Sequence, residues 1–333
     1  MSGHNTHHEA IIIGGGQAGL AVSYYLRRAG VEFLLLDNQL APGGAWRQYW
    51  PTLQLFSTPS FSSLPGMPMP SHPAAEYPPA SHVVDYLSRY EQRYDFNIER
   101  PVNVNRVSWE AGIYTVHAGE RTWTTPNLIS ATGIWSAPHT PSYPGSLTGT
   151  FWHAANYPGP ETFRGTRVAV VGGANSGAQI AAELSEVAEV TWYTRGQPQW
   201  MPDEVDGREL FRRYSARALA AQRGETAPLE EANPGRIVMV PAVRQARDSG
   251  RLKATPMFES VDEVETDHLI WCTGFDPALG HLREVLEGRV PKHPGMHLLG
   301  YGDWNGVGSG TILGVGPFAR AIAQAVKAQR SSE

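Results

Sequence analysis

The sequence predicts an α/β protein built from two units, in each of which strands and helices alternate along the chain. Two observations support this fold class. An apolar strand, a glycine-rich turn, a helix and a second strand follow one another over residues 9–37, and the same order returns from Arg167 to Arg195. The length of 333 residues agrees, because it is too great for one small domain and suits two or three.

The first unit begins with the apolar residues 10–13, which predict a buried strand. The strand is followed by the turn GGGQAG over residues 14–19, by a helix to about Ala29, and by a strand over residues 32–36 that ends at Asp37. This order is that of a Rossmann-like dinucleotide-binding unit.

The glycines of this turn stand where a dinucleotide site needs them. Gly14 permits the tight turn, Gly16 lets the backbone approach a pyrophosphate, and Gly19 lets the helix pack closely on the strand. The helix N-terminus offers amide donors to the phosphates, and Asp37 can accept hydrogen bonds from ribose hydroxyls. A glycine-rich turn without a ligand is the alternative, and the motif alone does not choose between FAD and NAD.

The second unit repeats the pattern with a strand over residues 168–171, the turn GGANSG over residues 172–177, a helix to about Val187 and a strand over residues 190–193. Two strand–turn–helix–strand patterns predict two separate nucleotide sites.

The second turn differs from the first in its chemistry. Ala174 replaces the middle glycine, and the side chains of Asn175 and Ser176 can donate hydrogen bonds to a phosphate. Where NAD would need a carboxylate at the strand end, the chain has Thr194 and Arg195, and a guanidinium suits a 2′-phosphate. We therefore expect NADPH, with NADH as the other possibility and a solvated surface charge as the other role for Arg195.

The rest of the chain is less regular. Residues 39–82 are rich in Pro, Ser and aromatic residues, and so long an irregular segment is usually functional. A helix is expected from the N-cap Ser81 to Tyr94, short strands over residues 101–132, and a last helix over residues 317–330. We expect residues 196–250 to be an insertion in the second unit, helical over residues 209–223.

Composition narrows the class of protein. The basic residues are scattered and the net charge is −5, so no nucleic-acid partner is expected. Apolar stretches are strand-sized, so we expect no membrane span. The His-rich start (His4, His7, His8) lacks the apolar region of a secretory signal, and we prefer a disordered arm to a metal-binding tract and predict no metal site. Cys272 is the single cysteine, which suits a cytoplasmic protein and leaves no redox-active cysteine pair.

Three further segments resemble the two-dinucleotide flavoproteins. Residues 42–46 (PGGAW) are similar to the segment that passes beside the flavin, and residues 130–133 (SATG) are similar to the element that closes an FAD domain. Residues 299–303 (LGYGD) resemble the late motif whose aspartate contacts the FAD ribityl or phosphate group. The resemblance implies a discontinuous FAD domain, made from both ends of the chain, with the NADPH domain inserted in it.

Residues 147–158 (LTGTFWHAANYP) resemble the fingerprint FxGxxxHxxx of the NADPH-dependent flavin monooxygenases. Leu147 replaces the usual Phe. Tyr157 resembles the flavin-containing monooxygenase branch and Pro158 the Baeyer–Villiger branch, so both subclasses stay open. For His153 we expect a structural role, anchoring a hinge between the two domains.

Nearly the whole chain resembles small bacterial flavin-containing monooxygenases, and residues 302–306 and 201–208 look like that subgroup. The resemblance implies that reduced FAD and dioxygen form a flavin hydroperoxide, which oxygenates a small organic substrate such as a sulfide or a cyclic ketone. Phe56 takes the place of an asparagine in the larger enzymes. An NAD(P)H oxidase or reductase, and a non-enzymatic flavin sensor, remain as alternatives, and monomer and homodimer are both open.

We therefore expect an FAD-binding domain over residues 1–155 and 275–333 and an NADPH-binding domain over residues 160–270. The predicted catalytic residues are Phe56 and His153. The residues predicted to bind the two cofactors are Gly14, Gly16, Gln17, Ala18, Gly19, Asp37, Gly44, Ala45, Trp46, Leu55, Val104, Ala131, Thr132, Gly133, Gly172, Ala174, Asn175, Ser176, Gly177, Thr194, Arg195, Cys272, Thr273, Gly274 and Asp303.

Overall fold

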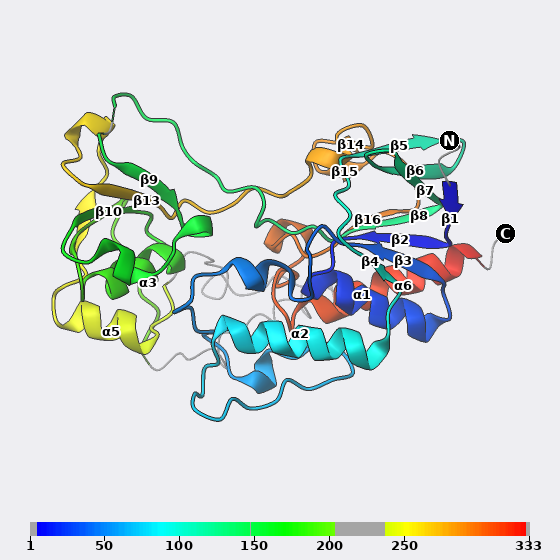
Figure 1. Cartoon of the computed structure of the whole chain (residues 1–333), viewed down its shortest axis with the longest axis horizontal. Coiled ribbons are helices and arrows are strands. Elements are labelled where there is room, and N and C mark those ends of the chain that lie inside the picture. The colour runs from blue at the N-terminus through cyan, green and yellow to red at the C-terminus, as the bar shows by residue number, and fades with distance from the viewer. Residues whose placement is uncertain (1–4, 147, 204–236, 331–333) are drawn as a thin grey trace. The chain divides into compact units, whose positions relative to one another are not determined.

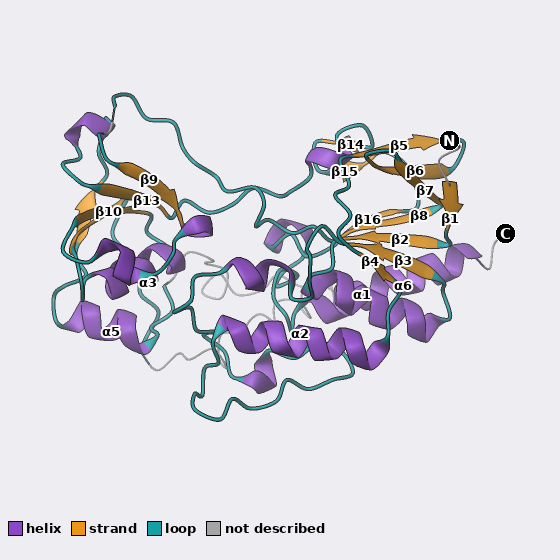
Figure 2. Cartoon of the chain, in the orientation of Figure 1, coloured by secondary structure: helices purple, strands orange, loops and turns teal. Residues whose placement is uncertain are grey.

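The structure is a computed structural model that describes residues 5–146, 148–203 and 237–330. The chain divides into two compact units (Figures 1 and 2). The first unit comprises Met1–Arg47, Pro59–Ser136 and Pro277–Glu333, and the second comprises Gln48–Thr58 and Ala137–Asp276. Each unit has a parallel sheet with helices packed on it, so the predicted α/β class with two Rossmann-like domains is confirmed.

A five-stranded parallel sheet forms the centre of the first unit. Its strands lie in the order β16 (Met296–Leu298), β8 (Asn127–Ser130), β2 (Ala10–Ile13), β3 (Phe33–Leu36) and β4 (Ile98–Glu99). Every residue of β2, β3 and β8 is buried, as expected of parallel strands covered on both faces. The helices α1 (Gln17–Ala29) and α6 (Val315–Arg330) lie side by side along one face (Figure 1).

The helix α1 shows why this sequence forms the unit. Its apolar face is buried on the sheet, its last turn carries Arg27 and Arg28 at the negative end of the dipole, and Gly30 ends it in the left-handed conformation (φ 73°). A third helix, α2 (Ala80–Tyr94), packs beside α1. Its N-cap is Pro79, so our prediction of Ser81 was wrong: the helix begins one residue before that serine.

A second, smaller sheet covers the other side of the first unit. Its strands lie in the order β1 (Asn5–His7), β7 (Arg121–Thr125), β6 (Ile113–Ala118) and β5 (Arg106–Glu110), followed later in the chain by the hairpin of β14 (Leu286–Glu287) and β15 (Val290–Pro291). Buried residues of β6 and β7 join the five-stranded sheet in one core with Leu128 and Ile11.

The N-terminal segment corrects one expectation. We expected a disordered arm, but from Asn5 onward the chain forms β1, because this segment pairs in parallel with β7. The side chain of His8 also lies 3.1 Å from a carboxylate oxygen of Glu32. His4 lies outside the described residues. Within the described parts of the chain, no group of three or more His, Cys, Asp or Glu side chains is arranged to hold a metal ion.

The second unit is built on another five-stranded parallel sheet. Its strands lie in the order β12 (Ala254–Pro256), β11 (Glu189–Thr194), β10 (Arg167–Val171), β13 (His268–Trp271) and β9 (Thr150–His153). The helices α3 (Asn175–Leu184) and α5 (Pro241–Asp248) pack against one another, and apolar residues of both join a core that contains Trp192 and Phe163. None of the described helices is both long and apolar enough to cross a bilayer.

The unit boundaries differ from those we expected. Residues 137–155 belong to the second unit rather than to the first, because β9 hydrogen-bonds to β13. Residues 48–58 also belong to the second unit: Trp50 is buried in its core against Tyr157. The helix α3 ends at Leu184 instead of Val187, and the predicted helix over residues 209–223 lies outside the described residues.

Candidate functional site: two nucleotide-binding turns

The first turn, Gly14 to Gly19, lies between β2 and α1. Two of its glycines are required by the fold itself. A methyl group on Gly14 (φ 107°) would lie 2.5 Å from the carbonyl oxygen of Ala131, and one on Gly19 would lie 1.9 Å from the carbonyl oxygen of Gly14. Both distances are far inside van der Waals contact, so glycine at these two positions lets the turn, α1 and the end of β8 meet.

Gly16 differs from those two glycines. A methyl group there would meet no protein atom within 4 Å, and its backbone is extended (φ −80°), so the protein does not require glycine at this position. Gly16 is the N-cap of α1, and the first intrahelical bond runs from Leu20 N to Gly16 O at 3.0 Å. The preceding amides of the first turn have no partner within the helix, which suits them to an anion. The turn therefore fits a dinucleotide pyrophosphate.

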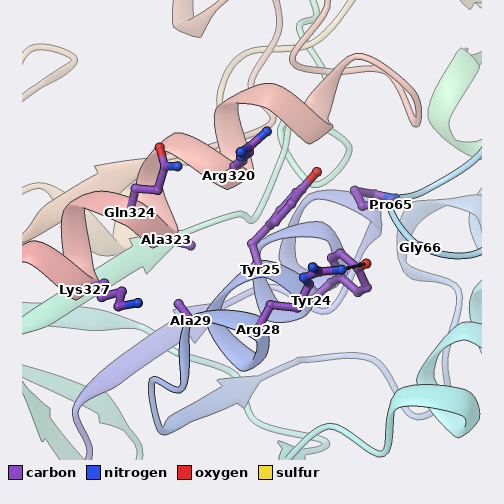
Figure 3. A pocket seen from close by; sticks show the side chains of 10 residues that line it. All are labelled: Tyr24, Tyr25, Arg28, Ala29, Pro65, Gly66, Arg320, Ala323, Gln324 and Lys327. Carbon is purple, nitrogen blue, oxygen red and sulfur yellow. Dashed lines mark hydrogen bonds between the residues drawn. The ribbon is translucent and has the colours of Figure 1, made fainter.

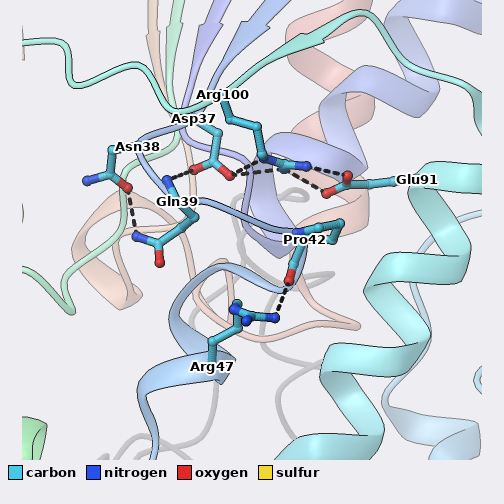
Figure 4. Close-up of polar contacts among 7 residues, drawn as sticks. All are labelled: Asp37, Asn38, Gln39, Pro42, Arg47, Glu91 and Arg100. Carbon is cyan, nitrogen blue, oxygen red and sulfur yellow. Dashed lines mark hydrogen bonds and ion pairs between the residues drawn. The ribbon is translucent and has the colours of Figure 1, made fainter.

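Asp37 belongs to a buried charge network with Arg100 and Glu91 beside this turn (Figure 4). Arg100 donates from Nε to Asp37 Oδ2 at 3.0 Å and from Nη1 to Glu91 Oε2 at 2.7 Å. Burial alone would lower the pKa of Arg100, but hydrogen bonding and charge from Glu91 and Asp37 raise it overall. A methyl group on Gly15 would lie 2.6 Å from Asp37 Oδ2, so the carboxylate and the turn are in contact. Among the described residues, the other oxygen, Oδ1, accepts one long hydrogen bond from Gln39 N at 3.4 Å.

Two segments distant in sequence lie against the turn. Gln17 joins them: its Oε1 accepts from Trp46 Nε1 at 2.9 Å, and its Nε2 donates to the carbonyl oxygen of Gly310 at 2.7 Å. The close approach depends on glycine, because a methyl group on Gly44 would lie 2.8 Å from Gly16 Cα, and one on Gly300 would lie 2.6 Å from Ala18 Cβ. Three of the motifs singled out in the sequence are thus brought together. Ala45 is half-buried between Gly44 and Trp46.

The segment after β8 is held by a hydrogen-bond network. Thr132 donates from Oγ1 to the carbonyl oxygen of Ala278 at 2.9 Å, and the hydroxyl of Tyr301 lies 2.6 Å from Ser130 Oγ and 2.8 Å from Thr132 Oγ1. Ser130 also contacts His281 Nε2 at 3.2 Å, and burial lowers the pKa of His281 to about 4, so this imidazole is neutral. Gly133 has φ 65° and its carbonyl oxygen accepts from Ala278 N.

The remaining residues predicted to bind FAD or to act in catalysis lie outside the contacts of the first turn described above. Asp303 is exposed at the start of a short 3-10 helix, and its Oδ1 accepts from Gly308 N at 3.1 Å. Val104 is half-buried and packs on the core of the first unit. Leu55 is buried and Phe56 half-buried in residues 48–58, so both belong to the second unit rather than to the first.

The second turn, Gly172 to Gly177, repeats the geometry of the first between β10 and α3. A methyl group on Gly172 (φ 142°) would lie 2.3 Å from the carbonyl oxygen of Cys272, and one on Gly177 would lie 2.0 Å from that of Gly172. Trp192 adds a fixed contact by donating from Nε1 to Gly172 O at 2.8 Å. Cys272 is a free, buried thiol that packs in the core, and burial raises its pKa.

Ala174 takes the N-cap position of α3 with an extended backbone (φ −114°), which an L-residue adopts without strain. The Oδ1 atom of Asn175 accepts a hydrogen bond from Val238 N at 2.8 Å, which fixes the side chain, and its NH₂ group is the donor that a phosphate would use. The half-buried Ser176 follows it. At the end of β11, Thr194 is buried and bonds to Gly196 O, whereas Arg195 is exposed.

His153 closes β9 and begins the next turn. Its Nδ1 accepts from Ala155 N at 3.0 Å, and its backbone amide donates to Asn156 Oδ1 at 2.7 Å, so it caps the following 3-10 helix. The ring is buried edge-on against Phe275 at 5.1 Å, and burial lowers its pKa. An Nδ1 that accepts leaves the proton of the neutral ring on Nε2.

The ring of His153 packs on a pair of crossing segments. His139 N donates to Gly274 O at 3.0 Å and Asp276 N donates to Ala137 O at 2.8 Å, in a short antiparallel bridge. Thr273 Oγ1 donates to His139 O, so Thr273 and Gly274 are part of this bridge rather than of the turn itself. The structure therefore gives His153 a structural environment in the second unit.

The fingerprint tyrosine joins a further buried group. Tyr157 lies in the core beside Glu183 of α3, whose Oε2 accepts from Thr52 Oγ1 at 2.6 Å. Burial raises the pKa of Glu183. This contact and the burial of Trp50 fix the segment that carries Leu55 and Phe56 to the second unit.

Sequence reasoning missed Arg100, Tyr301 and His281. Arg100 and His281 follow no motif, and their partners lie 63 and 151 residues away along the chain. Tyr301 stands inside the Gly-Asp motif over residues 299–303, and its position next to Gly300 was the one available signal for it.

Comparison with known proteins gives concordant matches. The family model of the pyridine nucleotide-disulphide oxidoreductases matches residues 11–295. The structure is similar to a flavin-containing monooxygenase from Stenotrophomonas maltophilia, with 40% sequence identity over 97% of this chain and 99% of that chain and a TM-score of 0.85. An uncharacterized CzcO-like oxidoreductase from Geobacillus kaustophilus is 28% identical over 94% of this chain and 97% of its own length. A probable indole-3-pyruvate monooxygenase, YUCCA9 from Arabidopsis thaliana, is 31% identical over 60% of this chain and 50% of its own.

Proposed function

We propose that this protein inserts one oxygen atom of dioxygen into a small organic sulfide. The chain belongs to the pyridine nucleotide-disulphide oxidoreductase family, and its relatives include a flavin-containing monooxygenase. Cyclic ketones are the second substrate class that we propose. Family membership confirms that the protein is an oxidoreductase and that its cofactors are the predicted FAD and NADPH. The observation that carries the proposal is the presence of two complete nucleotide turns in a chain whose single cysteine is buried.

The single buried cysteine excludes one class of electron acceptor. A thiol reductase needs an accessible pair of cysteines, and this chain has one cysteine in total. We propose that electrons entering from NADPH leave to dioxygen, which is supported by the similarity to a flavin-containing monooxygenase. The balanced reaction converts sulfide, dioxygen, NADPH and a proton into sulfoxide, NADP⁺ and water.

We assign FAD to the first turn. The amides at the start of α1 would bind the pyrophosphate, with Gly16 giving the room that the phosphates need. Asp37 would accept hydrogen bonds from the ribose through Oδ1, since Arg100 occupies Oδ2. When bound, FAD supplies the hydride acceptor and the centre that reacts with dioxygen. The segments that carry Trp46 and Asp303 are held beside the turn by Gln17 and by the loop's own bonds.

We assign NADPH to the second turn. The amides at the start of α3 and the NH₂ of Asn175 would bind the pyrophosphate, and the exposed guanidinium of Arg195 would pair with the 2′-phosphate. His153 acts as a positioning residue, because it caps the turn after β9 and packs on Phe275. The chain's own contribution to the chemistry is to orient both nucleotides and to exclude water from the reacting groups.

One observation favours a second candidate function. Phe56 stands where the family resemblance gives the larger enzymes an asparagine, and a phenyl ring has no hydrogen-bond donor. This favours an NADPH oxidase that releases hydrogen peroxide and oxygenates no substrate. Converting Phe56→Asn would then raise the yield of oxygenated product per NADPH.

A product screen distinguishes the two functions. The FAD-loaded enzyme is supplied with NADPH and with a panel of sulfides and cyclic ketones, and product and peroxide are quantified against NADPH consumed. The proposal predicts that sulfoxide accounts for most of the NADPH oxidised with at least one sulfide. Peroxide equal to the NADPH consumed with every substrate would contradict it and support the oxidase.

A further inference from the structure

A pocket on the outer face of the first unit lies away from the first turn (Figure 3). It has a volume of about 470 Å³, in the range of small-molecule sites. One wall is the C-terminal half of α1 and the other is one face of α6; residues 65–66 close the end. The polar and charged side chains that line it are Tyr24, Tyr25, Arg28, Arg320, Gln324 and Lys327.

The charge around this pocket is one-sided. Neither α1 nor α6 contains an acidic residue, although the protein as a whole has a net charge of −5. Arg28 faces the pocket from α1, while Arg320 and Lys327 stand two turns apart on the same face of α6. All three residues are exposed, so their charged groups can reach an anion in the pocket.

The macrodipole explains only part of this arrangement. Cations are favourable in the last turn of a helix, where Arg28 and Lys327 stand. Arg320 lies outside the last turn of α6, so the dipole does not account for its position. In the described part of the chain no carboxylate pairs with Arg320. Burial raises the pKa of Tyr25, and the nearby charge of Arg320 lowers it in part.

The aromatic wall of the pocket is rigid. Tyr24 and Tyr25 pack edge to face at 5.2 Å, and Figure 3 shows the ring of Tyr25 standing between the two helices. A methyl group on Gly66 would lie 2.4 Å from the ring of Tyr24, so the backbone of the closing loop rests on that ring. Two tyrosines of α2 fix this loop: Tyr90 donates to Pro65 O at 2.7 Å and Tyr94 to Gly66 O at 2.8 Å.

We propose that this pocket binds an organic phosphate, a phosphomonoester that carries a planar ring. The phosphate, with about two negative charges and three acceptor oxygens, lies between Arg320, Lys327 and Arg28. The ring packs against Tyr25, and Gln324 offers its amide to polar groups on the ring. The site lies on the same helix as the first turn but at its other end, so it is separate from both nucleotide sites.

The test is calorimetric titration of the full, FAD-loaded protein with phenyl phosphate, which lacks the adenosine that both cofactors carry. Saturable binding at millimolar concentration or below is expected, with inorganic phosphate and phenol each binding more weakly. Arg320→Gln should raise the dissociation constant about tenfold, the size of one lost charge-assisted hydrogen bond. Tyr25→Ala should reduce the affinity for phenyl phosphate to that for inorganic phosphate.

Two matched variants complete the design. Arg121→Gln removes the same charge from the small sheet of the first unit, where Arg121 is 55% exposed, and should leave binding unchanged. Arg195→Gln should also leave it unchanged, because Arg195 lies in the second unit. No binding by the wild-type protein, or equal weakening by Arg121→Gln and Arg320→Gln, would overturn the proposal. Loss of binding in Arg195→Gln would move the ligand to the second turn and overturn it as well.

Discussion

The two glycine-rich turns have the same frame and differ at the position that faces a ligand. In each, a methyl group on the first or last glycine would lie between 1.9 and 2.5 Å from a backbone oxygen, so the packing of strand on helix demands glycine. The middle position has no such constraint, because a methyl group on Gly16 meets no protein atom within 4 Å and the other turn already has Ala174. The comparison separates the glycines that the fold requires from Gly16, which the fold does not require and for which we propose a role in ligand binding.

The strand ends beside the two turns also differ. Asp37 is buried and tied to Arg100 and Glu91, which makes the first site anionic and rigid. At the matching end of β11, the chain has a buried Thr194 and an exposed Arg195, which makes the second site cationic at its surface. The two sheets share the same order of strands around the turn. The two turns thus share one frame and differ at the strand end, where we propose that the two dinucleotides are distinguished.

The largest expected effect comes from the buried charge network of the first unit. Arg100→Gln leaves Asp37 and Glu91 buried without their cation, so the free energy of unfolding should fall by about 3 to 5 kcal/mol. Arg106→Gln is the control, since it breaks an exposed pair with Glu284 and should cost less than about 1 kcal/mol. Urea unfolding measures both. Equal losses for the two variants would show that the buried network stabilises the first unit no more than an exposed ion pair does.

The next effect tests the shared frame. Gly19→Ala and Gly177→Ala each force a methyl group onto a backbone oxygen, at a cost of about 3 kcal/mol or more in the affected unit. The purified Gly19→Ala protein should lose its flavin absorbance, whereas Gly177→Ala should keep it and fail to bind NADPH. Gly280→Ala and Gly196→Ala are controls, because their methyl groups meet nothing within 4 Å. A Gly177→Ala protein that loses flavin while Gly19→Ala retains it would reverse our assignment of the turns.

The first unit should also be sensitive to acid through His281. Its pKa is lowered from 6.5 to about 4, so the unfolded chain takes up a proton at higher pH than the folded protein. Its stabilising contribution is complete above pH 6.5 and is lost as the pH falls through about 4, by about 3 kcal/mol at most. Unfolding measured across this range should depend less on pH in His281→Gln than in the wild type. Parallel curves for the two proteins would contradict this origin.

A smaller effect is expected at the ligand-facing position. Gly16→Ala should leave the free energy of unfolding of the FAD-free protein within about 0.5 kcal/mol, yet weaken FAD binding about tenfold. Ala174→Gly should change NADPH binding by no more than about threefold. Flavin titration and NADPH titration measure the two. A large loss of stability in FAD-free Gly16→Ala would mean that the fold, not the ligand, requires this glycine.

The last prediction concerns coenzyme choice. Arg195→Ala should raise the KM for NADPH about tenfold and leave the KM for NADH unchanged, because only the 2′-phosphate loses its partner. Steady-state kinetics with each coenzyme provide the measurement. If the use of NADPH is unchanged, Arg195 is a solvated surface charge and our assignment is wrong.

The features that could be predicted from the sequence are those determined by residues close together along the chain. The turns were found because their glycines, the strand before and the helix after occupy one short segment. The predicted end of α1 at about Ala29 agrees with the structure, but α1 begins at Gln17, inside the segment that we expected to be turn. Arg100 and His281 were not predicted, because each contacts a residue far away along the chain, Asp37 and Ser130 respectively. The domain boundary was misplaced for the same reason: only the pairing of β9 with β13 assigns the fingerprint strand to the second unit. Likewise, nothing local in residues 48–58 indicates that Trp50 packs against Tyr157.

The central claim is that electrons from NADPH at the second turn reach dioxygen through FAD at the first, and that one oxygen atom enters the substrate. Its most direct test is oxidation of methyl phenyl sulfide under ¹⁸O₂, with the sulfoxide analysed by mass spectrometry and NADPH consumption followed in parallel. We predict that the sulfoxide carries one ¹⁸O atom and forms in proportion to the NADPH consumed. Unlabelled sulfoxide, or NADPH consumption balanced entirely by hydrogen peroxide, would contradict the account.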